Sequence, residues 1–281
     1  MNSNMSRFIT IAILFCCACA TAQTPTPVDQ PTTQPAVQPK QPAAVELGPQ
    51  KVKAPSVRIH QAFGEFLKTY VRGDAFDYDG ASRDRKQLDA YVSRIAQTDP
   101  STLAGREEKL AFYINAYNAL TIASVLSFWP NIKSVSTIKP NFEFFKAPVH
   151  ALGGKKVSLD QIENKIIRPT FNDPRIHAAL NCASKSCPPL ANFAFEADRL
   201  NDQLDRVFKA FANDPGRNRV DPETGVVALS KILDWYKVDF ASAGGAAAYL
   251  ARYVDDDVRK RLLLNPKSIS FLEYDWQLNI P

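Results

Sequence analysis

The chain has 281 residues and a formal net charge of +5, with 34 Lys and Arg against 29 Asp and Glu. Its basic residues are scattered along the sequence, which excludes the clustered positive charge that a nucleic-acid-binding surface requires. The sequence contains no apolar run of the roughly 20 residues that a membrane-spanning helix takes. It also lacks an internal repeat, so we expect a globular protein with no nucleic acid partner.

The N-terminus has the order of a secretory signal. Residues 1–7 carry a positive charge, residues 8–20 are almost wholly apolar, and Ala20-Thr21-Ala22 supplies the small residues of a cleavage site. We therefore expect a signal peptide over residues 1–22, a periplasmic or secreted location, and no integral membrane span after cleavage. A retained anchor helix and a lipid anchor on Cys17 or Cys19 are the alternatives.

Residues 23–56 differ sharply in composition from the remainder of the chain. They are rich in Pro, Gln, Thr, Ala and Val and contain no aromatic residue. Such a segment buries too little apolar surface to offset the entropy of ordering it. The pattern predicts a disordered linker over residues 23–56 that spaces the domain, rather than a Pro-rich docking motif. Residues 57–281 are long enough to form one globular domain with its own core.

The first half of this domain is predicted to be helical. Hydrophobic periodicity indicates helices over residues 57–70, 82–96 and 106–128. The third is apolar on most sides, so we expect it to be central and buried. Asn115 and Asn118 lie inside it, and because Asn is a poor residue for a helix interior, two of them need a reason.

The second half mixes helices with short strands. After an irregular stretch over 131–146, Gly153-Gly154 predicts a hairpin over 148–157, and Ser158 with Gln161 forms a capping box that starts a helix including Glu163. Further along we expect an amphipathic helix over 195–211, a hairpin over 218–229, helices over 230–236 and 245–253, and a strand over 269–274. The sum is an α+β fold: a helix-rich single domain with a small antiparallel sheet.

The densest group of reactive side chains lies between Asp173 and Leu190. This segment holds His177, one of three histidines, and two of the five cysteines, Cys182 and Cys187. The other cysteines belong to the expected signal, so these two are all that the mature chain keeps.

Five separated blocks of sequence resemble the domain of unknown function 547 family, which is found in bacterial exported proteins and in some plant proteins. The blocks are residues 111–120, 158–163, 173–190, 229–240 and 271–279. The resemblance covers nearly all of residues 57–281 and implies no established activity. One departure is Asn164, which stands where many relatives have His, and this weakens any metal site that would need a second histidine.

The two cysteines allow several interpretations. In an oxidising compartment the first is a structural Cys182–Cys187 disulfide. The second makes Cys182 a nucleophile with His177 as its base, which requires the chain to bend near Asn181. Zinc bound by His177, Cys182 and Cys187 would lack a fourth ligand, and redox exchange would use a spacing longer than that of thioredoxin-like motifs.

Other polar residues have both structural and functional interpretations. Asn115, Asn118 and Glu163 are expected to bind loop backbone, although an Asn that orients His177 or stabilises an oxyanion is the functional alternative. His60, on an exposed helix shoulder, and His150, on a hairpin, are expected to be incidental.

The aromatic residues near the C-terminus are expected to belong to the core rather than to a ligand platform. They are Trp235, Tyr236, Tyr274 and Trp276. Asp239 and Asp275 lie beside them and are expected to accept their polar hydrogens rather than to act as a catalytic pair.

Two functions remain open on this evidence. The first is an exported cell-envelope protein whose binding or assembly domain is held by a structural Cys182–Cys187 pair, with a small molecule or an envelope protein as partner. The alternative is a cysteine-dependent hydrolase or transferase that acts on an amide or thioester, with Cys182 as nucleophile and His177 as base. Neither implies a cofactor or a metal.

Overall fold

A computed structural model of the chain describes residues 59–138 and 142–281. The expected signal peptide (1–22), the expected linker (23–56) and both alternatives on Cys17 and Cys19 lie outside the described residues. No described helix is long and apolar enough to cross a membrane.

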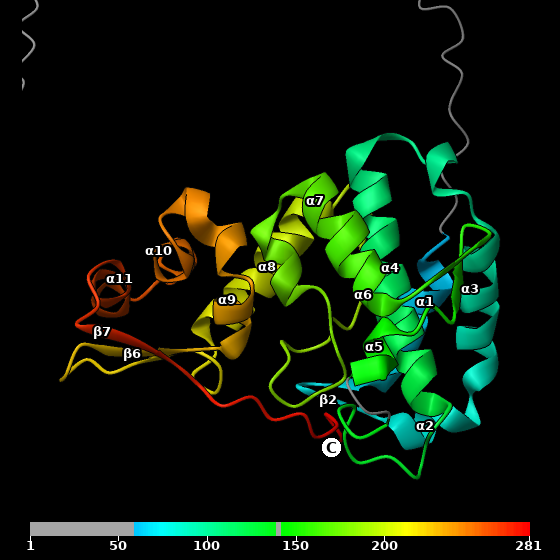
Figure 1. Cartoon of the computed structure of the whole chain (residues 1–281), viewed down its shortest axis with the longest axis horizontal. Coiled ribbons are helices and arrows are strands. Elements are labelled where there is room, and N and C mark those ends of the chain that lie inside the picture. Colours follow the sequence, from blue (N-terminus) through cyan, green and yellow to red (C-terminus); the bar gives the residue numbers. More distant parts are fainter. Residues whose placement is uncertain (1–58, 139–141) are drawn as a thin grey trace, which may run out of the picture. The chain divides into compact units, whose positions relative to one another are not determined.

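The helices and strands follow the expected mixture (Figure 1). The α-helices are α1 (Gln61–Tyr70), α2 (Tyr78–Arg83), α3 (Arg85–Gln97), α4 (Gly105–Leu126), α5 (Glu143–Lys146), α6 (Leu159–Gln161), α7 (Arg168–Phe171), α8 (Leu200–Asn213), α9 (Lys231–Trp235), α10 (Ala246–Leu250) and α11 (Asp257–Leu264). Short 3-10 segments are η1 (Pro100–Thr102), η4 (Pro174–Ala178) and η5 (Lys237–Ala243), and η3 (Ile162–Ile167) is a π-helix. The strands are β1 (Val71–Arg72), β2 (Ala75–Phe76), β3 (His150–Leu152), β4 (Lys155–Val157), β5 (Arg219–Val220), β6 (Val226–Leu229) and β7 (Ser268–Phe271).

Helix α4 is the buried centre of the N-terminal half, as predicted. Glu107 and Glu108 lie in its first turn, where negative charge favours the helix dipole. Most of its remaining side chains are buried, and it contacts α3 on one side and α6 and η3 on another. A helix that is apolar nearly all round must be covered by other elements, which explains this central place.

The turn chemistry of the sequence also predicts local structure correctly. Strands β3 and β4 form an antiparallel hairpin, and Gly153 and Gly154 in its turn have φ values of 56° and 75°, which glycine adopts without strain. The Ser158 hydroxyl accepts the Gln161 N–H at 3.0 Å, and the Gln161 side chain accepts the Ser158 N–H at 2.9 Å. This capping box starts the helical run that carries Glu163.

The sheet is mixed, which corrects the expected antiparallel one. Strands β5 and β6 form the predicted antiparallel hairpin, but β6 and β7 run parallel over four residue pairs. Parallel neighbours need a long crossover, and α9, η5, α10 and α11 supply it between them. The β1–β2 and β3–β4 pairs are separate two-stranded sheets, so the helix-rich α+β class is confirmed.

Two apolar clusters make up the core, and α8 takes part in both. Leu204 belongs to the larger cluster around α1, α3 and α4, whereas Phe208 and Phe211 belong to the smaller one that includes α10 and β6. The short η4 segment does the same, with Ile176 in the first and Ala178 in the second. His177 therefore lies where the two clusters meet.

Candidate functional site

A pocket of about 590 Å³ lies beside this junction. Its lining includes His177, Cys182 and Cys187, together with Glu163 of η3 and aromatic side chains from α9 and from the segment after β7. The segment that the sequence singled out is therefore in contact with a cavity rather than sealed in packing.

Cys182 is the partly buried thiol of the pocket, and its Sγ has two hydroxyl partners. Tyr274 Oη lies 3.0 Å away and Ser184 Oγ lies 3.1 Å away. Burial raises the pKa of this thiol, but hydrogen bonds with Cys187, Ser184 and Tyr274 outweigh burial and lower the pKa to about 7. Donors to a thiolate stabilise the charged form, so Cys182 is poised to react near neutral pH.

Cys187 is a free, buried thiol, and no Cys182–Cys187 disulfide is seen in the described residues. Its Sγ accepts the backbone N–H of Cys182 at 3.0 Å, while the Sγ of Cys182 is directed to Ser184 and Tyr274. The two cysteine side chains also hydrogen-bond each other. Burial, followed by the adjacent Cys182, raises the pKa of Cys187.

His177 is held by a carboxylate and an aromatic ring. Its Nε2 lies 2.8 Å from Asp239 Oδ2, and its ring stacks on Tyr236 with centroids 4.2 Å apart. Since Nε2 faces Asp239, the other ring nitrogen, Nδ1, is the one left for the pocket. A histidine oriented by a carboxylate is the usual arrangement of a general base.

Arg168 binds the same carboxylate as His177. Its guanidinium contacts both oxygens of Asp239 at 2.7 Å and lies 4.7 Å from the centre of the Tyr236 ring. Burial favours the neutral acid, but hydrogen bonds from His177 and Arg168 dominate and hold the pKa of Asp239 well below its ordinary value. The carboxylate therefore stays ionised and fixes the imidazole.

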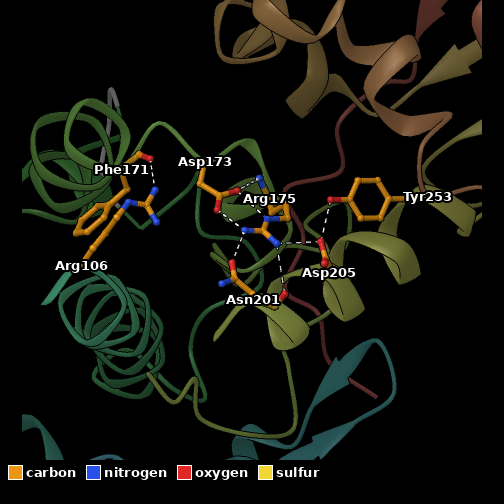
Figure 2. A network of polar contacts seen from close by, with 7 residues as sticks. All are labelled: Arg106, Phe171, Asp173, Arg175, Asn201, Asp205 and Tyr253. Carbon is orange, nitrogen blue, oxygen red and sulfur yellow. Dashed lines mark hydrogen bonds and ion pairs between the residues drawn. The ribbon is translucent and has the colours of Figure 1, made fainter. Parts of the chain in front are cut away.

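A network around Arg175 anchors the η4 segment that carries His177 (Figure 2). The Arg175 guanidinium binds Asp173 at 2.6 and 2.9 Å, and it reaches Asn201 and Asp205 on α8. Asp205 also accepts the Tyr253 hydroxyl at 2.9 Å. Arg175 lies two residues before His177, so these contacts hold η4 against α8 close to His177.

The loop from residue 179 to 187 is held from several directions. Asn181 accepts the N–H of Ala183 at 2.9 Å and donates to the carbonyl of Pro188 at 2.8 Å. Arg217 donates to the carbonyl of Cys187 at 2.8 Å. Ala183 has a φ of 65°, a conformation that costs a residue with a side chain about 1 kcal/mol or more. A strained, well-anchored turn directly after Cys182 is typical of a functional site.

Comparison with known proteins places part of this site in a family. Residues 100–212 match the family described as "Protein of unknown function, DUF547". This segment of the chain is similar to the DUF547 family. The resemblance inferred from the sequence blocks is thus confirmed for this part of the chain. Searches of curated proteins and of solved structures found no match.

The DUF547 match holds only part of the pocket. It includes α4, Glu163, His177 and both cysteines, whereas Asp239 and Tyr274 lie after its C-terminal end. One hydroxyl partner of the thiol, Tyr274, and the carboxylate partner of the imidazole, Asp239, therefore come from the later part of the chain.

Within the matched residues 100–212, the two asparagines of α4 bind backbone. Asn115 donates to the carbonyl of Phe195 at 2.8 Å and accepts its N–H at 2.9 Å. Asn118 donates to the carbonyl of Ala179 and accepts the N–H of Asn181, both at 2.9 Å. Both amides are fully occupied, so the geometry favours their structural role over an oxyanion or a His177-orienting role. Neither contact involves Glu163, which lies in the pocket wall.

The two remaining histidines lie away from the pocket. His60 is half-buried, not on an exposed shoulder: its Nδ1 lies 2.6 Å from the Tyr91 hydroxyl and its ring packs against Phe112. The hydrophobic face of α1 brings it there. His150 lies on β3 as expected, and its Nε2 is buried without a hydrogen-bond partner among the described residues.

Two of the C-terminal aromatic residues, Tyr236 and Trp276, pack against the core as expected, but all four also line the pocket. Trp235 is 44 % exposed, and Tyr236, Tyr274 and Trp276 are only partly buried. Asp239 binds His177 and Arg168 rather than aromatic hydrogens, and Asp275 is exposed and accepts the N–H of Gln277. The two carboxylates do not converge.

Sequence reasoning missed the partners of the two reactive side chains. Tyr274, Asp239 and Arg168 were each visible as polar residues, but no local pattern linked them to Cys182 or His177. Among the described residues, no group of three His, Cys, Asp or Glu side chains is placed to hold a metal ion. His177, Cys182 and Cys187 therefore do not form such a group.

Proposed function

We propose that the chain is an exported cysteine-dependent hydrolase or transferase that acts on an amide or thioester. The observation that carries the proposal is one pocket lined by both a thiol with a pKa of about 7 and a histidine bound to a carboxylate. A thiolate near neutral pH is a strong nucleophile, and a carboxylate-oriented imidazole transfers protons efficiently.

The reaction follows from these roles. The Cys182 sulfur attacks the substrate carbonyl carbon, and its proton passes to His177. The amide C–N or thioester C–S bond then breaks, and His177 returns the proton to the leaving group. Water, in a hydrolase, or an acceptor nucleophile, in a transferase, attacks the acyl-cysteine while His177 takes its proton, and the Cys182 thiolate leaves.

Two further residues have supporting roles in this proposal. Tyr274 Oη, 3.0 Å from the sulfur, is the hydroxyl placed to stabilise the developing oxyanion. Asp239 is a positioning residue, because it keeps the imidazole oriented and stabilises the imidazolium that forms. Arg168 acts through Asp239.

The test uses the full chain and S-phenyl thioacetate, with peptide mapping by mass spectrometry. We expect an acetyl group on Cys182 and release of thiophenol. Cys182→Ser should abolish the adduct, and Cys187→Ser should retain it at the same position. His177→Gln should slow thiophenol release by about 100-fold.

Two outcomes would overturn the proposal. One is wild-type protein that releases no thiophenol above the background reaction, which would leave a binding or assembly domain as the function. The other is release that persists in Cys182→Ser.

Export is tested by mass spectra of protein taken from the periplasm, because cleavage after Ala22 gives a chain that begins at Gln23.

A further inference from the structure

The pocket contains a carboxylate without a charged partner. Glu163 of η3 is half-buried in the pocket wall, and it forms no ion pair within residues 59–138 and 142–281. The Tyr236 hydroxyl donates a hydrogen bond to Glu163, and Arg168 attracts it without forming an ion pair. A partly desolvated carboxylate of this kind is stabilised further when a ligand brings a cation to it.

The neighbouring charges do not neutralise it. Arg168 lies near Glu163, but its guanidinium is bound to both oxygens of Asp239 and to Asn164. The second pocket carboxylate, Asp160, has only the neutral Asn164 amide as its described partner, and Lys146 is exposed. The lining thus carries Asp160 and Glu163 against Lys146, an excess of negative charge to which the Cys182 thiolate adds.

Aromatic rings form another part of the same wall. Trp235 and Trp276 stack with centroids 5.6 Å apart, and Tyr274 packs against both at 4.8 and 4.5 Å. Phe142 packs against Trp276 at 5.0 Å. The face of an aromatic ring attracts a cation through the ring's quadrupole, and Trp is the strongest of them.

We propose that the pocket recognises an ammonium group on its substrate, bound by the Trp235–Tyr274–Trp276 wall and by Glu163. This names the substrate class of the cysteine chemistry proposed above and rests on it. An acyl or leaving group that bears a primary or quaternary ammonium fits the combination of negative charge and aromatic surface, and an anionic group is repelled by both.

Binding can be measured without any reaction, because two tryptophans line the pocket and report occupancy. Choline and its uncharged isostere 3,3-dimethylbutan-1-ol are titrated into the full chain while tryptophan fluorescence is recorded. We expect choline to bind about tenfold more tightly than the isostere. Glu163→Gln should weaken choline binding about fivefold and leave the isostere unchanged. The matched control is Glu65→Gln, the same change at an exposed position on α1, which should leave both titrations as in the wild type.

Equal binding of choline and the isostere, or an unchanged choline titration in Glu163→Gln, would overturn the inference. A second measurement separates this failure from failure of the proposed function. The acylation rate of Cys182 is compared for aryl thioesters whose acyl groups carry a trimethylammonium, a neutral or a carboxylate end. Acylation in which the three react alike refutes charge recognition while the cysteine chemistry stands. Absence of acylation with all three refutes the chemistry, and the fluorescence titration then decides ammonium binding by itself.

Discussion

Cys182 owes its lowered pKa to neutral donors rather than to a nearby positive charge. Tyr274, Ser184 and Cys187 each contribute a hydrogen bond that is stronger when the sulfur is a thiolate. In the proposed reaction, His177 is therefore not needed to hold the sulfur as a thiolate and can act on the substrate. A thiolate held in this way keeps its reactivity over a broad range of salt concentration, because hydrogen bonds of this kind are screened little.

Removal of one donor should therefore be measurable. In Tyr274→Phe the Cys182 thiolate loses its 3.0 Å hydroxyl partner, so the pKa should rise from about 7 towards the ordinary value near 9. The pH midpoint of alkylation by iodoacetamide should move upward, and the rate at pH 7 should fall several-fold.

The control is Tyr113→Phe, a half-buried tyrosine of α4 that makes no hydrogen bond to the thiol. Its alkylation profile should match that of the wild type. An unchanged midpoint in Tyr274→Phe would show that the hydroxyl does not stabilise the thiolate.

At this scale the sequence predicted the reactive side chains and not their partners. His177 and Cys182 are five residues apart, so one polar segment revealed both. Asp239 is 62 residues from His177 and Tyr274 is 92 residues from Cys182, and such pairings depend on tertiary packing.

Among the elements, α4 shapes the loop that carries Cys182. Asn118 uses both ends of its amide on the backbone of Ala179 and Asn181, and Asn115 does the same on Phe195. The backbone groups of these irregular segments have no partners in a helix or a sheet, so the buried Asn side chains supply their hydrogen bonds. Phe195 is drawn out of the helical pattern in this way, which explains why α8 begins at Leu200 rather than at the expected residue 195.

Loss of the Asn118 hydrogen bonds to the backbone should lower the stability of the protein. Asn118→Ala leaves a buried carbonyl and a buried N–H without partners, and we expect the free energy of unfolding to fall by about 3 kcal/mol. Urea denaturation measures the change. The exposed Asn131→Ala should stay within about 0.5 kcal/mol of the wild type. A similarly small effect of Asn118→Ala would show that these hydrogen bonds do not stabilise the loop.

The elements themselves were predicted best where local rules decide them. The capping box at Ser158, the Gly153-Gly154 hairpin and the apolar helix α4 all depend on residues close in sequence. The parallel pairing of β6 with β7 was missed, because β7 pairs with β6 only after a crossover of four helical segments.

Across the whole molecule, two apolar clusters are joined by α8 and η4, and the pocket lies at their junction. Burial in the larger cluster also shapes the response of the whole protein to acid. Burial lowers the pKa of His60 to about 4, and it lowers the pKa of His150 as well. Burial therefore favours the neutral form of both histidines in the folded protein.

This arrangement predicts acid destabilisation in a defined range. Between pH 6.5 and about 4 the unfolded chain binds a proton at His60 and the folded chain does not, so stability falls as the pH drops. The expected loss from His60 is up to about 3 kcal/mol at the acid end. His60→Gln keeps a polar partner for the Tyr91 hydroxyl and cannot titrate, so its unfolding free energy should vary less with pH over the same range. The slope should decrease further in His60→Gln combined with His150→Gln, and carboxylates with a lowered pKa such as Asp239 account for the slope that remains at the acid end. Urea denaturation at pH 7.0, 6.0, 5.0 and 4.5 compares the three proteins, and parallel pH profiles would show that these imidazoles are already protonated in the folded state.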